Sequence, residues 1–456
     1  AAAAALRRAL DAVRAAGKPV AAYGERLSQP EYWVASGADR VWLPETGAIH
    51  LVGLRSEALF FARLLERLAL RPEVVRMGSH KSAAEMLTRQ AMSPESREQV
   101  EHYLDDVLGA LVRAVAAGRR VGADVARDWV DRGPYRADTA CEAGLADACL
   151  YPDEVEERLA EWVRESGEPP PRGGAPRARL VDAAGYAALH ATDAGFAPAL
   201  AEQPRIAYVV AEGAIRRRGG RGISAESVVR LLRGLGDDEA VRAIVLRIDS
   251  PGGDALASDL VWRALEVAKR GRPLVVSMGE VAASGGYFAA VAGDTVFAET
   301  TTLTGSIGVV GGKLDASGAL ARLGVDTDAV ERGARAGLLS AVRGFTADER
   351  AVVRSDIEAV YDVFVRRVAD GRKLDRAAVE RAAQGRIWSG ERALALGLVD
   401  AIGGPLEAIR EARARAGLAA HERTQLQICP RVAPLEALRG LLGVELRIDA
   451  GLRGEL

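Results

Sequence analysis

Hydrophobic and polar residues follow two different periods along the chain. Residues 206–215, IAYVVAEGAI, place apolar side chains at alternating positions, which is typical of a strand. Residues 225–235 have the spacing of a helix, and residues 240–253, AVRAIVLRIDSPGG, indicate a buried strand that runs into a glycine turn. Strands that alternate with helices predict the α/β class, with layered, mainly parallel sheets and flanking helices.

The same unit occurs twice in the chain. The segment GKPVAAYGERLSQPEYWVASGADRVW, which begins at Gly17, matches GRPLVVSMGEVAASGGYFAAVAGDTVF, which begins at Gly271, and the offset settles at 255 residues. The aligned pairs include Gly24 with Gly279, Tyr32 with Tyr287, Asp39 with Asp294 and Gly78 with Gly333, and at offset 253 Asp147 with Asp400. The series keeps its order over about 130 positions, so the chain contains two tandem copies of one α/β unit.

These copies divide the chain into four predicted parts. They are a first repeat over residues 1–163, a linker over 164–203 that contains PPPRGGAPR, a second repeat over 204–404, and a helix–strand–helix extension over 405–456. The first copy begins at the equivalent of a helix of the second copy, residues 1–16 against 255–270. The leading strands and the first glycine turn have no counterpart in it, so we expect a first repeat that is truncated at its N-terminus.

Composition excludes several classes of function. The 456 residues are 49% apolar and 27% charged, as in an ordinary globular protein, and 61 basic against 63 acidic residues leave no excess charge to follow a nucleic-acid backbone. Cys141, Cys149 and Cys429 form neither a disulfide framework nor a CxxC motif, although Cys141 and Cys149 could pair in an oxidising compartment. No stretch approaches 18 strongly apolar residues. We expect no metal, no cofactor and no nucleic-acid partner.

Three glycine-rich clusters in the second copy hold the candidate chemistry. They are DSPGG at 249–253, ASGGY at 283–287 and TGSIG at 304–308. Glycines after strands free backbone N–H groups, and two such turns could hold an oxyanion. Ser284 is expected at a helix start, where its hydroxyl is accessible and the helix dipole favours negative charge. An N-cap serine beside packing turns would give the same pattern.

A nucleophilic serine needs a base, and the second copy contains no histidine. A buried lysine of lowered pKa can serve instead. Lys81, in MGSHKSAAE of the first copy, has small neighbours and a setting that could bury its side chain. In the alignment Ser284 faces Gln29 and Lys81 faces Ala336, so each copy lacks the group that the other holds. This favours one composite site shared between the two copies.

In combination, DSPGG, SMGEVAASGGYFAA and TGSIGVVGG, with HKSAAE in the first copy, resemble the signal peptide peptidase A (protease IV) family of the long tandem-domain bacterial type, peptidase family S49. The resemblance runs from about Gly17 to Gly404. It implies two tandem Clp-protease/crotonase-like repeats. One departure is His80, where members of the family usually have tyrosine.

The resemblance also implies roles and surroundings. Ser284 would be the nucleophile, Lys81 the general base, and Ser306 the residue that orients the lysine. The chain would form a homotetramer that cleaves signal peptides and other extended apolar peptides. It would face the periplasm from the bacterial inner membrane, held by an N-terminal anchor that we expect to lie outside this chain.

The predicted reaction is peptide hydrolysis by a Ser/Lys dyad, with backbone N–H groups of Gly252, Gly253 and Gly285 as the oxyanion donors. The dyad could form within one chain or between neighbouring subunits. His80 and Lys313 stay open as other bases. Two further functions stay open as well: a crotonase-like acyl-CoA enzyme, which would need carboxylates at the oxyanion hole and a nucleotide pocket, and a catalytically inactive scaffold.

Overall fold

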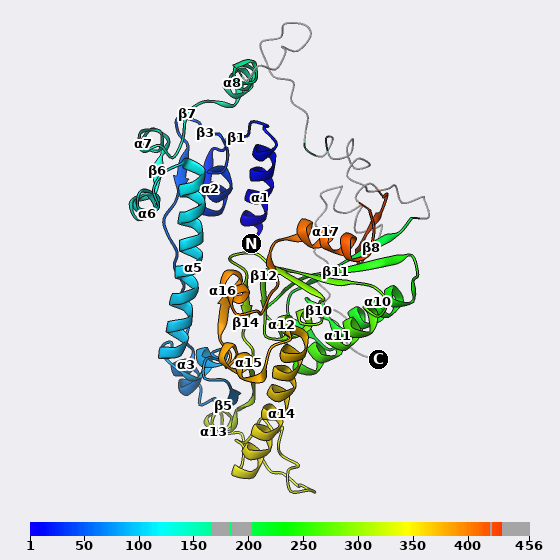
Figure 1. The fold of residues 1–456 in the computed structure, drawn as a ribbon. Coiled ribbons are helices and arrows are strands. Elements are labelled where there is room, and N and C mark those ends of the chain that lie inside the picture. Colours follow the sequence, from blue (N-terminus) through cyan, green and yellow to red (C-terminus); the bar gives the residue numbers. More distant parts are fainter. Residues whose placement is uncertain (166–182, 184–185, 187–202, 420–421, 431–456) are drawn as a thin grey trace, which may run out of the picture.

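The computed structural model describes residues 1–165, 183, 186, 203–419 and 422–430 (Figure 1). The first repeat contains α1 (Ala2–Ala15), β1 (Ala21–Tyr23), β2 (Arg26–Ser28), α2 (Gln29–Ala35), β3 (Arg40–Leu43), β4 (Ala48–His50), α3 (Ala62–Arg67), β5 (Arg71–Met77), α4 (Glu85–Thr88), α5 (Pro94–Arg119), α6 (Ala123–Arg132), β6 (Tyr135–Arg136), α7 (Ala137–Ala143), β7 (Ala148–Cys149) and α8 (Pro152–Glu165). The second contains β8 (Arg205–Glu212), β9 (Ile215–Arg216), β10 (Ile223–Ser224), α10 (Ala225–Asp237), β11 (Val241–Ser250), α11 (Ala255–Ala268), β12 (Leu274–Ala283), α12 (Gly285–Ala290), β13 (Thr295–Ala298), β14 (Leu303–Gly305), β15 (Val309–Asp315), α13 (Ser317–Arg322), α14 (Ala347–Arg372), α15 (Arg376–Ala382), β16 (Ile387–Ser389), α16 (Gly390–Ala395), β17 (Ala401–Ile402), α17 (Pro405–Arg415) and β18 (Gln425–Cys429).

The second repeat is built on one mainly parallel sheet. Its strand order is β16–β14–β12–β11–β8–β18, and β13 pairs with both β12 and β17. Among the described strands of this sheet, only the β14–β16 pair is antiparallel. The central strand β11 is apolar on both faces because both are covered (Figure 1): Ile244 and Leu246 pack towards α10 and α11, and Ala243 and Val245 pack towards α17.

The first repeat has smaller sheets of order β1–β3–β7 and β2–β4–β6. Its core is separate from that of the second repeat, with Tyr32, Ile49, Leu111 and Trp129 among its buried members. The long helix α5 runs from beside α2 and α6 of this repeat, past β16 of the second repeat, towards α3 (Figure 1). The short strands therefore depend on α5 and α6 for cover, as expected of sheets too small to be stable alone.

Hydrogen bonds at equivalent positions confirm the predicted duplication. The hydroxyl of Tyr32 donates to Leu145 O at 2.9 Å, and that of Tyr287 donates to Leu398 O at 2.8 Å. The aspartates that end the two copies accept from strand amides in the same way. These contacts are Val41 N to Asp147 Oδ2 and Val296 N to Asp400 Oδ2, each 2.7 Å. Both copies also contain a 26-residue helix, α5 or α14, which is followed by a residue in the left-handed region.

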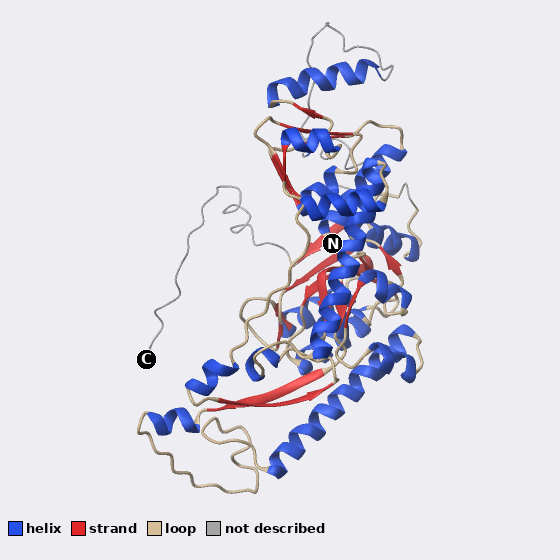
Figure 2. Ribbon diagram, turned by 90° about the vertical axis from the view of Figure 1, so that its left-hand side faces the viewer, coloured by secondary structure: helices blue, strands red, loops and turns tan. Residues whose placement is uncertain are grey.

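The two repeats are joined by a long ribbon. Strand β5 of the first repeat pairs antiparallel with β15 of the second, from Arg71 opposite Asp315 to Met77 opposite Val309. Figure 2 shows this ribbon as the long pair of strands beside α14. One copy thereby places a strand, and the turn that follows it, against the other.

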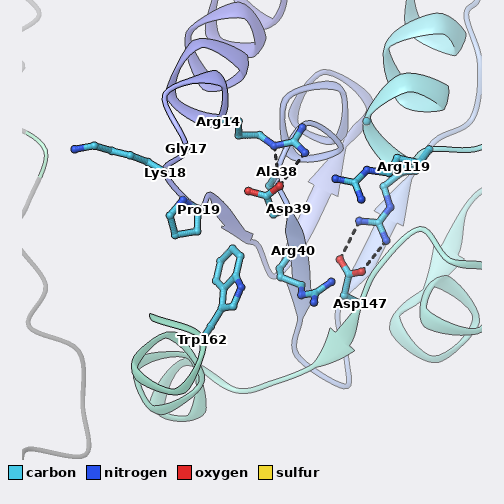
Figure 3. A pocket seen from close by; sticks show the side chains of 12 residues that line it. Arg14, Gly17, Lys18, Pro19, Ala38, Asp39, Arg40, Arg119, Asp147 and Trp162 are labelled. Atoms are coloured by element: carbon cyan, nitrogen blue, oxygen red, sulfur yellow. Dashed lines mark hydrogen bonds and ion pairs between the residues drawn. The ribbon is translucent and has the colours of Figure 1, made fainter. Parts of the chain in front are cut away.

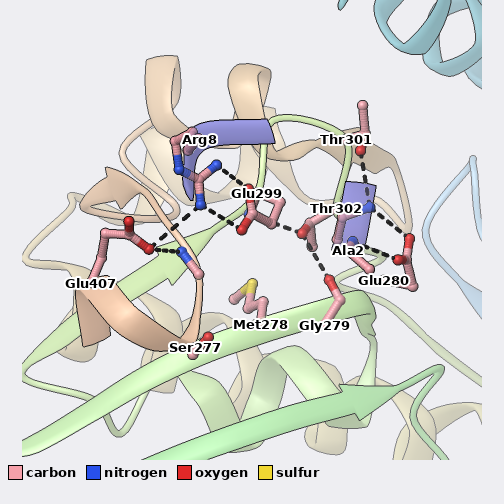
Figure 4. A network of polar contacts seen from close by, with 12 residues as sticks. Ala2, Arg8, Ser277, Met278, Gly279, Glu280, Glu299, Thr301, Thr302 and Glu407 are labelled. Carbon is pink, nitrogen blue, oxygen red and sulfur yellow. Dashed lines mark hydrogen bonds and ion pairs between the residues drawn. The ribbon is translucent and has the colours of Figure 1, made fainter. Parts of the chain in front are cut away.

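A polar network adds a second junction (Figure 4). Arg8 of α1 donates to both carboxylate oxygens of the buried Glu299, at 2.7 Å to Oε1, and lies 3.5 Å from Glu407 at the start of α17. The Thr302 hydroxyl accepts a hydrogen bond from the Glu299 backbone N–H at 3.0 Å and donates one to Gly279 O at 2.8 Å. A paired and hydrogen-bonded carboxylate of this kind ties α1 to the second repeat.

Several sequence predictions fall at the margins of the described residues. The predicted linker over 164–203 lies almost wholly outside them, as does the final helix of the predicted extension. The other two elements of that extension pack on the second repeat, since β18 pairs with β8 and α17 covers the same sheet. Cys141 Sγ and Cys149 Sγ are hydrogen-bonded at 3.4 Å, and no disulfide joins them. No helix in the described part of the chain is long and apolar enough to cross a membrane.

Candidate active site

Ser284 lies between the end of β12 and the start of α12. Its backbone has φ +53° and ψ −120°, a conformation that L residues seldom adopt. Such strain persists only where neighbours enforce it, and it is common at functional sites. The amide of Ser284 donates to Gly305 O at 2.9 Å. A Cβ at Gly285 would lie 2.3 Å from Ser258 Oγ, so any larger residue directly after the serine would displace the Ser258 side chain.

Lys81 lies in the turn that follows β5 and is only 5% exposed. Its Nζ is 2.9 Å from Ser284 Oγ, 2.9 Å from Ser306 O and 3.0 Å from Ser306 Oγ. Burial lowers the pKa of Lys81 to about 8, and no charged group contributes to this shift. The structure thus brings the three expected residues together within one chain, without a neighbouring subunit.

Ser306 follows β14 and also has a positive φ, +51°. Its amide donates to Arg386 O at 2.6 Å, next to the antiparallel pairing of β14 with β16. The backbone carbonyl and the hydroxyl of Ser306 both point at the lysine amine. Ser306 therefore supplies two of the three polar contacts of Lys81 Nζ.

The glycine turn at 252–253 faces the serine. A Cβ at Gly252 would lie 2.7 Å from Gly285 N and 2.8 Å from Ser284 Cβ, and Gly252 has φ +100°. The N–H of Gly252 donates to Ser250 Oγ at 3.1 Å. Within the described part of the chain, the N–H groups of Gly253 and Gly285 have no hydrogen-bond acceptor. Of the three expected oxyanion donors, these two are free to bind a substrate oxygen.

The lysine loop is fixed by residues that the sequence did not reveal. Gln99 on α5 donates from Nε2 to His80 O and to Ser82 Oγ, each at 3.2 Å, and its Oε1 accepts from Ile387 N at 3.2 Å. A Cβ at Gly385 would lie 2.5 Å from Lys81 N. The Gln99 hydrogen bonds and the close approach of the Gly385 backbone hold the loop against the second repeat. A glutamine on an amphipathic helix and a glycine in AAQGRIW carry no motif signal.

The other candidate bases lie elsewhere. His80 is buried, with Nδ1 2.8 Å from Ser79 Oγ and Nε2 4.0 Å from Glu98, and burial lowers its pKa. Lys313 donates to Leu338 O at 3.1 Å and lies over the ring of Phe345. Neither side chain contacts Ser284 in the described structure.

The arginine-lined pocket of the first repeat contains no dyad residue (Figure 3). Its volume is about 640 Å³, and two of its arginines are held in ion pairs, Arg14 with Asp39 and Arg119 with Asp147. The second of these pairs recurs as Arg372 with Asp400 in the second repeat. These pairs belong to the shared scaffold. Among the described residues no cluster of three or more His, Cys, Asp or Glu side chains is arranged to hold a metal ion.

A family model described as "Peptidase family S49" matches residues 12–165 and 266–419. The chain therefore belongs to peptidase family S49, and it contains two copies of the family's repeat. The predicted fold class, two tandem α/β repeats with mainly parallel sheets, is confirmed.

Relatives with curated names match most of the chain. The chain is 30% identical to "Serine protease SPPA, chloroplastic" of Arabidopsis thaliana, over 99% of this chain and 66% of that protein. It is 31% identical to "Protease 4" of Haemophilus influenzae, over 87% of this chain and 65% of that protein. A candidate signal peptide peptidase SppA of Enterococcus faecium is 36% identical over 38% of this chain and 50% of its own length. The chain spans about two thirds of the first two relatives.

Among solved structures, a ClpP1 mutant of Listeria monocytogenes aligns with a TM-score of 0.31 and 16% identity, over 44% of this chain and 94% of that one.

Proposed function

We propose that the chain is a serine endopeptidase in which Ser284 is the nucleophile and Lys81 the general base. The observation that carries this proposal is the buried amine 2.9 Å from the serine hydroxyl, with a pKa lowered to about 8. A neutral amine has two N–H donors and one lone pair. Ser306 O and Ser306 Oγ accept the two N–H groups, which leaves the lone pair directed at the Ser284 hydroxyl.

In the proposed reaction the Lys81 lone pair takes the hydroxyl proton as Ser284 Oγ bonds to the peptide carbonyl carbon. The carbonyl π electrons move to oxygen, and the N–H groups of Gly253 and Gly285 stabilise the resulting oxyanion. The Lys81 ammonium then gives its proton to the departing amine as the C–N bond breaks. Neutral Lys81 next removes a proton from a water molecule as the water oxygen attacks the acyl-enzyme carbonyl carbon. The Lys81 ammonium then returns this proton to Ser284 Oγ as the ester C–O bond breaks, which releases the second product and restores the dyad.

The substrate class follows from the resemblance of the chain to the signal peptide peptidases of family S49. We infer extended apolar peptides, cleaved signal peptides among them, because a relative is named for such an activity and the free N–H groups of Gly253 and Gly285 beside Ser284 could bind a peptide carbonyl. We also infer a homotetramer at the bacterial inner membrane, facing the periplasm. The motifs shared with the family support these assignments.

A serine-directed fluorophosphonate probe tests the proposal. We expect one label per chain on Ser284, no label in Ser284→Ala, and slow label in Lys81→Arg, with parallel loss of hydrolysis of an apolar fluorogenic peptide. Ser340→Ala is the matched control, because the Ser340 hydroxyl only accepts from Val342 N. Absence of labelling in the folded wild type would overturn the peptidase assignment and leave an inactive scaffold or an acyl-CoA enzyme.

A further inference from the structure

Cys141 and Cys149 meet at an edge of the first repeat. Cys141 lies in α7, and Cys149 ends β7, the edge strand of the sheet β1–β3–β7 that packs beside α7 (Figure 1). Their sulfur atoms are in hydrogen-bond contact at 3.4 Å, and both residues are half-buried. A disulfide has an S–S distance of about 2.05 Å, so a movement of about 1.4 Å would bring the two sulfur atoms to bonding distance.

The second repeat has apolar residues at the two corresponding positions. At offset 253, Cys141 corresponds to Leu394 of α16, and Cys149 corresponds to Ile402 of β17. Strand β17 belongs to an eight-stranded sheet, whereas β7 belongs to a sheet of three strands. A small sheet buries little apolar surface and is only marginally stable by itself. A covalent link at this edge would supply what packing supplies in the second repeat.

The turn between the two cysteines is tied to the core of the first repeat. The hydroxyl of the buried Tyr32 donates to Leu145 O at 2.9 Å. The amide of the buried Val41 donates to Asp147 Oδ2 at 2.7 Å, and Arg119 Nη1 donates to the same oxygen at 2.9 Å. A bond between the cysteines would close this turn into a covalent ring and so hold all three contacts in place.

We propose that Cys141 and Cys149 form an intramolecular disulfide when the folded chain meets a disulfide oxidant. The Cys149 thiolate attacks one sulfur of the oxidant, whose S–S bond breaks and whose other sulfur leaves as a thiolate. Cys141 then loses its proton and attacks Cys149 Sγ, which expels the remaining oxidant sulfur. Two protein thiols are oxidised, one oxidant disulfide is reduced, and the two thiol protons end on the two sulfur atoms that leave.

The surroundings of the pair favour a structural disulfide over a catalytic one. Burial raises the pKa of the Cys141 thiol to about 12, and the hydrogen bond with Cys149 raises it further. Catalytic cysteines have a lowered pKa, and a thiol of high pKa is a poor leaving group, so the bond resists reduction once it has formed. Cys429 is only 1% exposed and lies in β18 of the second repeat, so it does not compete.

Peptide mass spectrometry tests for the bond directly. Both cysteines lie in one tryptic peptide, residues 137–158, because no lysine or arginine occurs between Arg136 and Arg158. The folded protein is incubated with oxidised glutathione, and its free thiols are then alkylated in denaturant. We expect the peptide to carry no alkyl group and to weigh two hydrogen atoms less than the reduced peptide.

The third cysteine and single variants are the controls for this measurement. Cys429 lies in a different tryptic peptide, residues 424–431, and should be alkylated in every sample. Cys429→Ser should form the same disulfide, whereas Cys141→Ser should form none. Two alkyl groups or two glutathione adducts on the peptide 137–158 of the oxidised wild type would overturn the proposal.

Thermal unfolding measures the effect of the bond on the first repeat. We expect oxidation to raise Tm by about 5–10 °C and dithiothreitol to reverse the change. The double variant Cys141→Leu with Cys149→Ile, which has the residues of the second repeat, should fold and have the same Tm with and without oxidant. A Tm shift of equal size in this variant would overturn the proposal.

The inference stands independently of the proposed peptidase activity, because neither cysteine contacts Ser284, Lys81 or Ser306 in the described structure. Fluorophosphonate labelling of Ser284 should therefore proceed at the same rate in the oxidised and the reduced protein. A protein that forms the disulfide and fails to label would retain this inference and lose the peptidase assignment. A protein that labels and keeps three free thiols would do the reverse.

Discussion

The two repeats have the same scaffold, yet each holds a different half of the candidate site. At the helix that follows the glycine-rich turn, the second repeat has Ser284 and the first has Gln29. After the ribbon strand the first repeat has Lys81, and the second has Ala336 at the equivalent position. The two halves of the candidate site therefore meet only at the junction of the two copies.

The surroundings of the two ribbon turns differ as much as their residues. Around Lys81 the turn is packed against Gln384 and Gly385 and held by Gln99. Its counterpart at residues 333–336 is exposed. The low pKa of Lys81 is thus a consequence of docking between repeats, since an exposed lysine keeps an ordinary pKa.

The largest effect is expected from Lys81→Arg. Arginine keeps the charge but stays protonated, so it cannot act as a base. We expect peptide hydrolysis to fall by about 1,000-fold or more in a folded protein, and Lys81→Met to be equally inactive. Lys313→Arg, in the second repeat, should retain activity. An active Lys81→Arg enzyme would return attention to His80.

Gly385→Ala tests whether docking of the lysine loop matters. Gly385 and Gly271 both have φ +77°, but a Cβ at Gly385 would meet Lys81 N at 2.5 Å, whereas one at Gly271 meets nothing within 4 Å. Both substitutions should cost about 1–2 kcal/mol of stability from backbone strain. Only Gly385→Ala should also lower kcat, by about 100-fold, because it displaces the base. Equal kcat values in the two variants would show that the loop position is not critical.

Ser306→Ala removes one of the two Ser306 acceptors for the lysine amine and keeps the backbone carbonyl. We expect kcat to fall by about 10–100-fold, with KM little changed, as for a residue that positions another. Steady-state kinetics separate the two constants. An unchanged kcat would leave Ser306 as a turn residue only.

Lys81→Met should change stability in a pH-dependent way. The folded pKa of Lys81, about 8, lies below its ordinary value of 10.5, so the folded chain binds fewer protons than the unfolded chain between these values. Wild-type stability should therefore rise with pH across this window, and the penalty should be constant below pH 8. Methionine lacks this penalty, so Lys81→Met should be more stable than the wild type by at most about 3 kcal/mol. The contacts to Ser306 that the variant loses make this gain in stability smaller. Urea denaturation at several pH values should show the difference between the variants shrinking from pH 8 to pH 10. A difference that is constant or grows would contradict the lowered pKa.

The sequence predicts much of the scaffold because its information is local or repeated. Alternating apolar residues give β8, and the glycine clusters give the turns at Gly253, Ser284 and Ser306. The duplication, read with the absence of histidine from the second copy, leads to Lys81. The pairing of β5 with β15 was not predictable, because it joins segments more than 230 residues apart (309 − 77 = 232) and neither strand carries a local signal for its partner. Gln99 and Gly385 escape detection for the same reason.

The most direct test of the central claim is the rate at which the fluorophosphonate probe labels Ser284 as a function of pH. In the wild type we expect the rate to rise with pH to a plateau, with a midpoint near pH 8, because only neutral Lys81 can accept the serine proton. In Lys81→Arg the rate should be low at every pH. A midpoint below pH 7, or a rising profile that survives in Lys81→Arg, would contradict the assignment of Lys81 as the base.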